Sequence, residues 1–220
     1  MGMEIDLLKN YPKSKRNLEE RSQNKSENIK RVARYFGKEF FDGDRNFGYG
    51  GFKYNSKFWQ PVIPDFIKHW DLNKNSSLLD VGCAKGFMLY DLMLKVPGIK
   101  LKGIDISQYA IDNSKAEVKS LLKVADAKKL PFTDNSFDAV ISINTIHNLD
   151  QSECAKALRE IVRVSKKKAF ITVDAYRNDD EKKKIYAWNL TAKTIMSVDD
   201  WKLFFKEVGY NGDYYWFIPY

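Results

Sequence analysis

The sequence has 220 residues, of which 44% are hydrophobic and 30% charged, and its formal net charge is +8. This length suits one substantial domain plus an extension, and the composition excludes wholesale disorder. The two cysteines and two histidines lie in unrelated contexts and are too few for a disulfide framework or a zinc cluster. We therefore expect free thiols and chemistry that needs no metal.

The sequence also limits the location and partners that we expect. No apolar run approaches the roughly 20 residues of a membrane span, and the N-terminus shows no apolar signal-peptide segment. We expect a cytoplasmic protein with no membrane partner. The excess of Lys and Arg in residues 1–40 is mild, which is typical of a solvated surface rather than of a nucleic-acid-binding arm. A homodimer is compatible with the sequence.

Residues 1–58 are predicted to form an N-terminal helical extension and a loop. Apolar residues recur at helical spacing late in residues 17–41, which predicts one helix whose second half packs. Glycines and aromatic residues alternate in residues 41–59, which indicates a loop with hinge freedom. A short amphipathic helix is expected within residues 61–72, after a proline.

Residues 59–220 are predicted to form one domain in which strands alternate with helices. Several strands are apolar on both faces, which indicates a parallel sheet covered on both sides. We expect a three-layer αβα sheet, mostly parallel, with right-handed crossovers and an antiparallel C-terminal strand. The strands are predicted over 77–82, 100–107, 120–126, 137–144, 168–176 and 214–220, and the helices over 86–96, 107–118, 152–165 and 198–210.

The most informative stretch is "LLDVGCAKG", in which a buried strand and a carboxylate run into a glycine-rich turn. A phosphate-binding P-loop needs Gly-x-x-x-x-Gly-Lys followed by Ser or Thr, and this stretch lacks both the spacing and the Lys-Ser/Thr pair. A dinucleotide-binding turn wants Gly-x-Gly-x-x-Gly, but Ala84 and Met88 stand at the second and third glycines. Another ligand that contains adenosine is therefore favoured.

The motif Asp-x-Gly-x-x-x-Gly resembles the first motif of class I S-adenosylmethionine-dependent methyltransferases, which commonly runs Asp-Val-Gly-Cys-Gly-x-Gly. Ala84 departs from it by replacing the middle glycine. The resemblance continues in the same order through "LKGIDIS", "VADAKKLPF", "FDAVISINTIHNL" and "ALREIVRVSKKKAFI", and it covers roughly residues 60–218. It implies a Rossmann-like methyltransferase fold, a transferase activity and S-adenosyl-L-methionine as the cofactor.

The resemblance also implies which residues hold the cofactor. Gly82 and Gly86 would let the main chain approach its amino-acid half. Asp105 would accept hydrogen bonds from the ribose hydroxyls, as a strand-end carboxylate does in dinucleotide folds. Asn144 would face the reactive end. The expected cofactor-binding set is Tyr49, Asp80, Gly82, Cys83, Gly86, Asp105, Ile106, Asp126, Ala127 and Asn144.

Each carboxylate in this set has a simpler interpretation, because Asp80 or Asp105 could merely cap a turn or helix. Their occurrence together with Asp126, at three successive strand ends, favours cofactor binding. Asp126 and Ala127 match the place where the family contacts the adenine amino group.

His147 is the candidate catalytic base, because "NTIHNL" places it just beyond the fourth strand. The alternative is that this histidine only packs and hydrogen-bonds. Tyr49, Gly50 and Gly51 could form a lid, since glycines supply hinge freedom and an aromatic ring can cover a sulfonium. A turn whose rings fill the sheet edge is the other interpretation.

The function that we expect is methyl transfer to a small, anionic or phosphorylated metabolite, by O-methylation. The stretch "RNFGYGGFKY" resembles methyltransferases of bacterial surface-polysaccharide biosynthesis, so a capsule precursor is a candidate acceptor. Two alternatives stay open. One is an RNA methyltransferase, which the basic charge favours. The other is a non-catalytic cofactor-binding scaffold, which Ala84 and the lack of an unambiguous base keep open.

Overall fold

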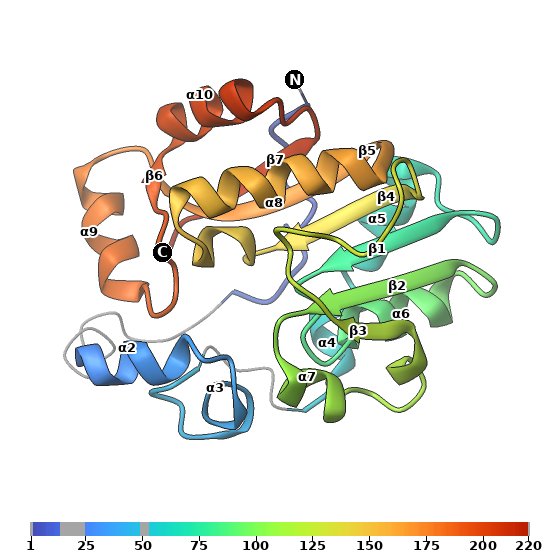
Figure 1. Ribbon diagram of the computed structural model, residues 1–220, viewed down its shortest axis with the longest axis horizontal. Helices are drawn as coiled ribbons and strands as arrows, with labels where there is room; N and C mark the ends of the chain where they lie inside the picture. Colours follow the sequence, from blue (N-terminus) through green and yellow to red (C-terminus); the bar gives the residue numbers. More distant parts are fainter. Residues whose placement is uncertain (1, 14–24, 49–52, 220) are drawn as a thin grey trace.

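A computed structural model describes residues 2–13, 25–48 and 53–219, and within them a central sheet organises the chain (Figure 1). Six strands follow the order β3-β2-β1-β4-β5-β6, and β7 pairs with β5. The strands are β1 Ser77–Val81, β2 Lys100–Asp105, β3 Leu122–Val124, β4 Phe137–Ile143, β5 Ser165–Tyr176, β6 Met196–Ser197 and β7 Asp213–Phe217.

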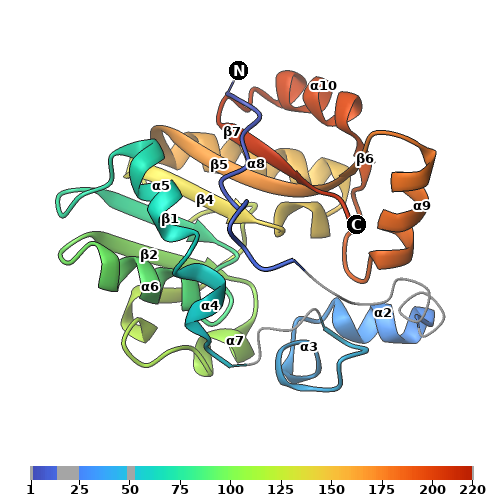
Figure 2. The ribbon, with the colours of Figure 1, turned by 180° about the vertical axis from the view of Figure 1, so that it is seen from behind.

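Helices cover both faces of the sheet. In Figure 1, α8 and α10 lie in front of the strands, whereas Figure 2 shows α5 and α6 on the other face. The helices are α2 Glu27–Ala33, α3 Lys38–Asp42, α4 Ser56–Trp59, α5 Ile63–Trp70, α6 Phe87–Lys95, α7 Gln108–Asp112, α8 Gln151–Val164, α9 Asp179–Trp188 and α10 Val198–Val208, with 3-10 turns η1 Lys119–Leu121 and η2 Ile146–Asn148.

The sequence of β1 shows why three layers form. Successive side chains of a strand point to opposite faces of the sheet. Leu78 belongs to the apolar core under α5 and α6, and the next residue, Leu79, belongs to the core under α8 and α10. Both side chains are fully buried. The predicted three-layer αβα arrangement is therefore confirmed.

The prediction of an antiparallel C-terminal strand is wrong. β7 runs parallel to β5, with Phe170 beside Asp213 and Asp174 beside Phe217. The reason is α10, which lies between β6 and β7 and returns the chain to the end of the sheet where strands begin. All strand pairings within the described residues are parallel. The outer edge of β7 is met by Glu4, which bridges to Tyr214 in parallel.

The single helix predicted over residues 17–41 is also corrected. Residues 17–24 lie outside the described residues, and the rest forms two short helices, α2 and α3. Phe36 has φ +49°, a left-handed conformation that ends a helix, and Gly37 caps the next one in an extended conformation. The Ser26 hydroxyl accepts a hydrogen bond from the Ile29 N–H and fixes the start of α2.

α9 was not predicted, because its sequence looked like a charged connection. Asn178 caps it by accepting a hydrogen bond from the Glu181 N–H, and its first turn is acidic. Ile185 and Trp188 are its buried residues. None of the helices in the described part of the chain is long and apolar enough to cross a membrane.

Candidate functional site

The site lies where the strand order reverses. The chain runs from β1 outward to β2 and β3 on one side, and then returns to β4 and β5 on the other. In such sheets ligands bind outside the carboxyl ends of the strands at this switch point. Polar side chains gather along this edge in the order Asp126, Asp105, Asp80, Asn144 and Asp174, each within two residues of the end of its strand.

Gly82 begins the turn after β1 and cannot carry a side chain. Its φ is +90°, and an added Cβ would lie 2.0 Å from the Thr145 Oγ1 atom. The N–H groups of Gly82 and Cys83 both donate to the Ile104 carbonyl. The glycine is therefore required by the packing of Thr145 against the turn, a reason that the sequence did not reveal.

Gly86 and Ala84 complete the turn in left-handed conformations. Gly86 has φ +73° and starts α6, and an added Cβ would lie 2.9 Å from the Leu122 Cδ1 atom. Ala84 has φ +48°, which is costly for a residue with a Cβ. Its N–H donates to the Asp105 Oδ2 atom at 2.8 Å. This hydrogen bond holds the turn against the end of β2.

Cys83 points away from the turn. Its side chain is buried in the core under α5 and α6, and a Cβ added at Gly103 would lie 2.8 Å from its Sγ atom. Burial, with the nearby charges of Asp80 and Asp105, raises the pKa of the thiol well above its usual value. Any contact between Cys83 and a ligand would therefore come from its backbone.

The two carboxylates beside the turn differ in their partners. Asp105 accepts hydrogen bonds from the Ala84 and Ser107 N–H groups, and burial raises its pKa. Asp80 is 5% exposed, and no group in the described residues donates a hydrogen bond to its carboxylate. Burial and the charge of Asp105 raise the pKa of Asp80 to about 8. A buried carboxylate without a partner suits a cationic ligand group.

Beyond Asp105 the edge offers an apolar surface. The Ile106 side chain is 56% exposed, which is unusual for isoleucine. Asp126 is half-buried and accepts a hydrogen bond from the Lys128 N–H. Ala127 packs beside the core under α8 and α10. These residues form the far end of the site.

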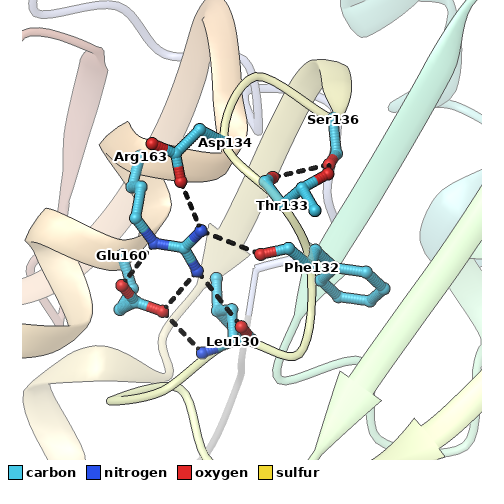
Figure 3. A network of polar contacts seen from close by, with 7 residues as sticks. All are labelled: Leu130, Phe132, Thr133, Asp134, Ser136, Glu160 and Arg163. Carbon is cyan, nitrogen blue, oxygen red and sulfur yellow. Dashed lines mark hydrogen bonds and ion pairs between the residues drawn. The ribbon is translucent and has the colours of Figure 1, made fainter.

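A clamp that sequence analysis missed fixes the loop that follows Asp126 (Figure 3). The Arg163 guanidinium, on α8, donates to the carbonyls of Leu130 and Phe132 and pairs with Glu160 and Asp134. The Leu130 N–H donates to Glu160 in turn. The spacing of Glu160 and Arg163 on one helix face was a signal that could have predicted their pairing.

Asn144 ends β4 in a left-handed conformation with φ +50°, which asparagine tolerates well. It is exposed, and its side-chain oxygen accepts a hydrogen bond from the Thr172 hydroxyl at 2.9 Å. The Asn144 N–H donates to Thr172 as well. Its amide is thereby oriented from the neighbouring strand.

His147 lies in η2, beneath the surface. Its side chain is buried, and its Nδ1 atom accepts a hydrogen bond from the Asp174 N–H at 2.8 Å. Burial lowers the pKa of His147 to about 3. A neutral ring whose Nδ1 accepts must carry its proton on Nε2. Such a ring is a weak base, so these contacts agree better with the packing alternative.

The extension contacts the turn directly, which the sequence did not predict. The Lys85 ammonium, buried within the turn, pairs with both Asp42 oxygens at 2.6 and 2.7 Å. The Tyr109 hydroxyl donates to the same carboxylate, and the Ser107 hydroxyl donates to the Phe36 carbonyl. Residues 26–48 are thereby attached to the sheet edge beside the glycine turn and the end of β2.

The proposed lid residues Tyr49, Gly50 and Gly51 lie outside the described residues, so the lid stays a prediction. Lys25 and Arg34, which flank α2, donate to the carbonyls of Ala187 and Thr191 near the end of α9. Within the described residues no group of three or more His, Cys, Asp or Glu side chains could hold a metal ion.

Comparisons with known proteins find methyltransferases among the relatives of this chain. The methyltransferase domain model matches residues 79–173. Ajmaline N-methyltransferase from Rauvolfia serpentina is 33% identical over 113 residues, which cover 49% of this chain and 38% of that protein. The tRNA (carboxymethyluridine(34)-5-O)-methyltransferase of Arabidopsis thaliana is 32% identical over 122 residues, 55% of this chain and 28% of that protein.

Among solved structures, that of the MccD protein has a TM-score of 0.52 and 31% identity, covering 66% of this chain and 68% of that chain. The order of the parallel strands and the helices on both faces of the sheet define a protein of the Rossmann-like αβα class. More narrowly, the chain belongs to the class I S-adenosylmethionine-dependent methyltransferases. S-adenosyl-L-methionine is the methyl donor of this family. The chain spans less than half the length of the two named enzymes.

Proposed function

We propose that this protein transfers a methyl group from S-adenosylmethionine to a hydroxyl of a small, anionic metabolite. The observation that carries the cofactor assignment is the buried Asp80 carboxylate, which lacks a partner in the described residues and lies at the switch point. The Asp80 carboxylate would accept a hydrogen bond from the cofactor's amino group. Asp105 would accept hydrogen bonds from the ribose hydroxyls, and Ile106 would pack on the adenine. The cofactor supplies an electrophilic methyl group on a positively charged sulfur.

The rest of the site would bind the acceptor. Asn144, which follows β4, and Thr172 of β5 form a hydrogen-bonded polar pair, and Lys25 and Arg34 lie beside the end of α9. Cationic side chains at this position favour an acceptor that carries a phosphate or a carboxylate. A nucleotide-linked sugar, such as a capsule precursor, combines such a group with free hydroxyls.

The catalytic contribution of the chain would be mainly alignment. Methyl transfer is an in-line displacement, and holding donor and acceptor collinear can contribute up to about 7 to 11 kcal/mol. The test is transfer of isotopically labelled methyl from S-adenosylmethionine to UDP-linked sugars, followed by mass spectrometry of the product. Incorporation into the nucleotide sugar supports the proposal, and incorporation only into added RNA would contradict it.

RNA is the second candidate acceptor, because one relative is named as a tRNA methyltransferase and the chain carries a net charge of +8. Binding to RNA through phosphate contacts has a steep salt dependence. Filter binding of total tRNA between about 50 and 200 mM salt separates the candidates, since phosphate contacts would weaken binding by orders of magnitude across this range. A small-molecule enzyme should show only weak binding at both ends.

A further inference from the structure

Asp174, near the end of β5, is a buried acid that the cofactor does not explain. Asp174 is 4% exposed, and no hydrogen bond within the described residues reaches its carboxylate, whose Oδ1 atom lies 3.6 Å from the His147 Nδ1 atom. Its backbone is fully engaged, because the N–H donates to His147 and the carbonyl accepts from the Trp201 indole. Aspartate is seldom buried unless it is paired. A fixed backbone that carries an unpartnered carboxylate indicates a ligand-binding group.

The position of Asp174 favours the acceptor as that ligand. It lies two residues after Thr172, so the two side chains share one face of β5, and Thr172 is the residue that orients Asn144. This face continues the core under α5 and α6, to which Phe170 belongs. The cofactor carboxylates Asp80 and Asp105 stand on β1 and β2, on the other side of β4.

The surroundings of Asp174 keep it able to take up a proton. The titratable groups beside it are His147 from η2, with Nδ1 3.6 Å from the Asp174 Oδ1 atom, and Lys25 from the segment before α2. β7 and α10 contribute uncharged neighbours, Phe217 and Trp201. Burial raises the pKa of Asp174 to about 7, partly offset by Lys25. A base is most effective when its pKa lies near the working pH.

We propose that Asp174 is the catalytic base of methyl transfer, and that the acceptor is therefore a hydroxyl rather than a phosphate oxygen. Asp174 takes the hydroxyl proton while the oxygen bonds to the methyl carbon. The carbon–sulfur bond breaks at the same time, and its electron pair stays on the sulfur, which becomes neutral. The proton then passes from Asp174 to water. His147 is a positioning residue that holds the Asp174 backbone.

This inference rests on the proposed function but is tested separately from it. The first experiment needs no acceptor. Protein labelled with [γ-13C]aspartate is titrated by NMR with S-adenosylhomocysteine bound, and the Asp174 signal is assigned from its loss in Asp174→Asn. A midpoint between about 6 and 8 supports the inference. A midpoint below about 5 would overturn it, because the carboxylate would then be an ordinary ionised group.

The second experiment measures catalysis. Labelled methyl transfer from S-adenosylmethionine into a low-molecular-mass bacterial metabolite extract is followed against pH for the wild type, Asp174→Asn, Asp174→Glu and His147→Gln. We expect the wild-type rate to rise with a midpoint near 7. Asp174→Asn should lower the rate about 100-fold to 10,000-fold and abolish its rise with pH. Asp174→Glu should restore part of the rate. His147→Gln, which keeps an acceptor, should cost less than about tenfold.

The control is Asp180→Asn, an exposed aspartate in the first turn of α9, which should behave as the wild type. A methyl ether as the product supports the inference, and a methyl phosphate ester would overturn it. Wild-type rates in Asp174→Asn would also overturn it. If the wild type methylates nothing in the extract, that result counts against the proposed function, and the NMR titration still decides the ionisation on which the base depends.

Discussion

The proposed cofactor half and the proposed acceptor half of the site are built in different ways. The proposed cofactor half comes mainly from one stretch, β1 through the loop after β3, within which Asp105 accepts hydrogen bonds from the Ala84 and Ser107 N–H groups. The acceptor half joins the ends of β4 and β5 to residues before α2 and after α9. Asp80 in one half and Asp174 in the other are nonetheless alike, since both are buried carboxylates without hydrogen-bond donors in the described residues.

This difference suggests a division of labour. A turn formed by one stretch of sequence can preserve cofactor binding while the sequences of distant segments change. The identity of the acceptor then depends on which segments meet at β5. Substitutions in the cofactor half should therefore reduce stability or cofactor affinity, whereas substitutions in the acceptor half should reduce turnover. Four changes test this distinction.

The largest effect is expected for Gly82→Ala in the cofactor half. The new Cβ would lie 2.0 Å from the Thr145 Oγ1 atom, and φ is +90°. Clash and strain together should lower the free energy of unfolding by about 3 to 5 kcal/mol, as measured by urea denaturation. Gly209→Ala is the matched control, because its φ is +78° with nothing within 4 Å of an added Cβ. It should cost only about 1 to 2 kcal/mol, and equal losses would refute the packing explanation.

The second effect concerns stability against pH in the acceptor half. The pKa of Asp174 is raised from 3.8 to about 7 in the folded state. The folded state therefore binds the proton more tightly than the unfolded state, which stabilises the fold. This contribution to the free energy of unfolding is complete below about pH 4 and is lost as the pH rises through about 7. Asparagine stays neutral, so Asp174→Asn should be more stable than the wild type at pH 8, on the order of a few kcal/mol, with little difference at pH 4.

Urea denaturation at both pH values measures this difference. Asp180→Asn again serves as the control and should follow the wild-type pH profile. Parallel profiles for the wild type and Asp174→Asn would show that Asp174 is ionised and compensated in the folded protein. The same variant is expected to lose turnover, so gain of stability with loss of rate is the pattern that identifies a functional group.

A smaller gain is expected for Ala84→Gly, which restores the family's middle glycine. Ala84 holds φ +48°, and relief of that strain outweighs the extra freedom of glycine in the unfolded chain. The free energy of unfolding should rise by about 0.5 to 1 kcal/mol. Ala116→Gly, at an exposed position without positive φ, should lower it slightly. A loss of stability in Ala84→Gly would mean that the turn is not strained.

The smallest effect is expected at the contact between the extension and the glycine turn. Burial alone would raise the pKa of Asp42, but hydrogen bonds from Lys85 and Tyr109 outweigh it, and the pKa is lowered. Asp42→Asn removes the charge, and amides of residues 26–48 should exchange with solvent about threefold to tenfold faster. Hydrogen exchange detected by mass spectrometry measures this. Asp44→Asn, two residues beyond Asp42 and just after α3, should leave the exchange rates unchanged. Equal acceleration in both variants would contradict a specific role of the Asp42 contact.

The sequence predicted the three layers and the edge of the sheet that carries the candidate site, because both depend on local sequence patterns. Apolar runs such as those of β1 and β4 identify buried strands, and carboxylates that follow successive strands must meet at one edge of a parallel sheet. Asp80, Asp105 and Asp126 lie at such strand ends, and the resemblance to the methyltransferase family is what singled them out. The glycine turn was found too, although the need for glycine at Gly82 comes from Thr145.

What the sequence could not predict depends on pairs of distant residues. The pairing of Lys85 with Asp42 and the clamp of Arg163 on Leu130 join separate elements. The direction of β7 follows from where α10 crosses, and five residues of strand sequence look alike in either direction. The burial of Asp174 likewise depends on neighbours from other elements, so its raised pKa has no local signal.

Calorimetric titration with S-adenosylhomocysteine tests the division between the two halves most directly. The wild type should bind one equivalent. Asp105→Asn should weaken binding by about 1.5 to 3 kcal/mol, because the ribose hydroxyls lose a charged acceptor, whereas Asp174→Asn should leave the affinity within about threefold. No binding by the wild type, or equal weakening in the two variants, would contradict the account.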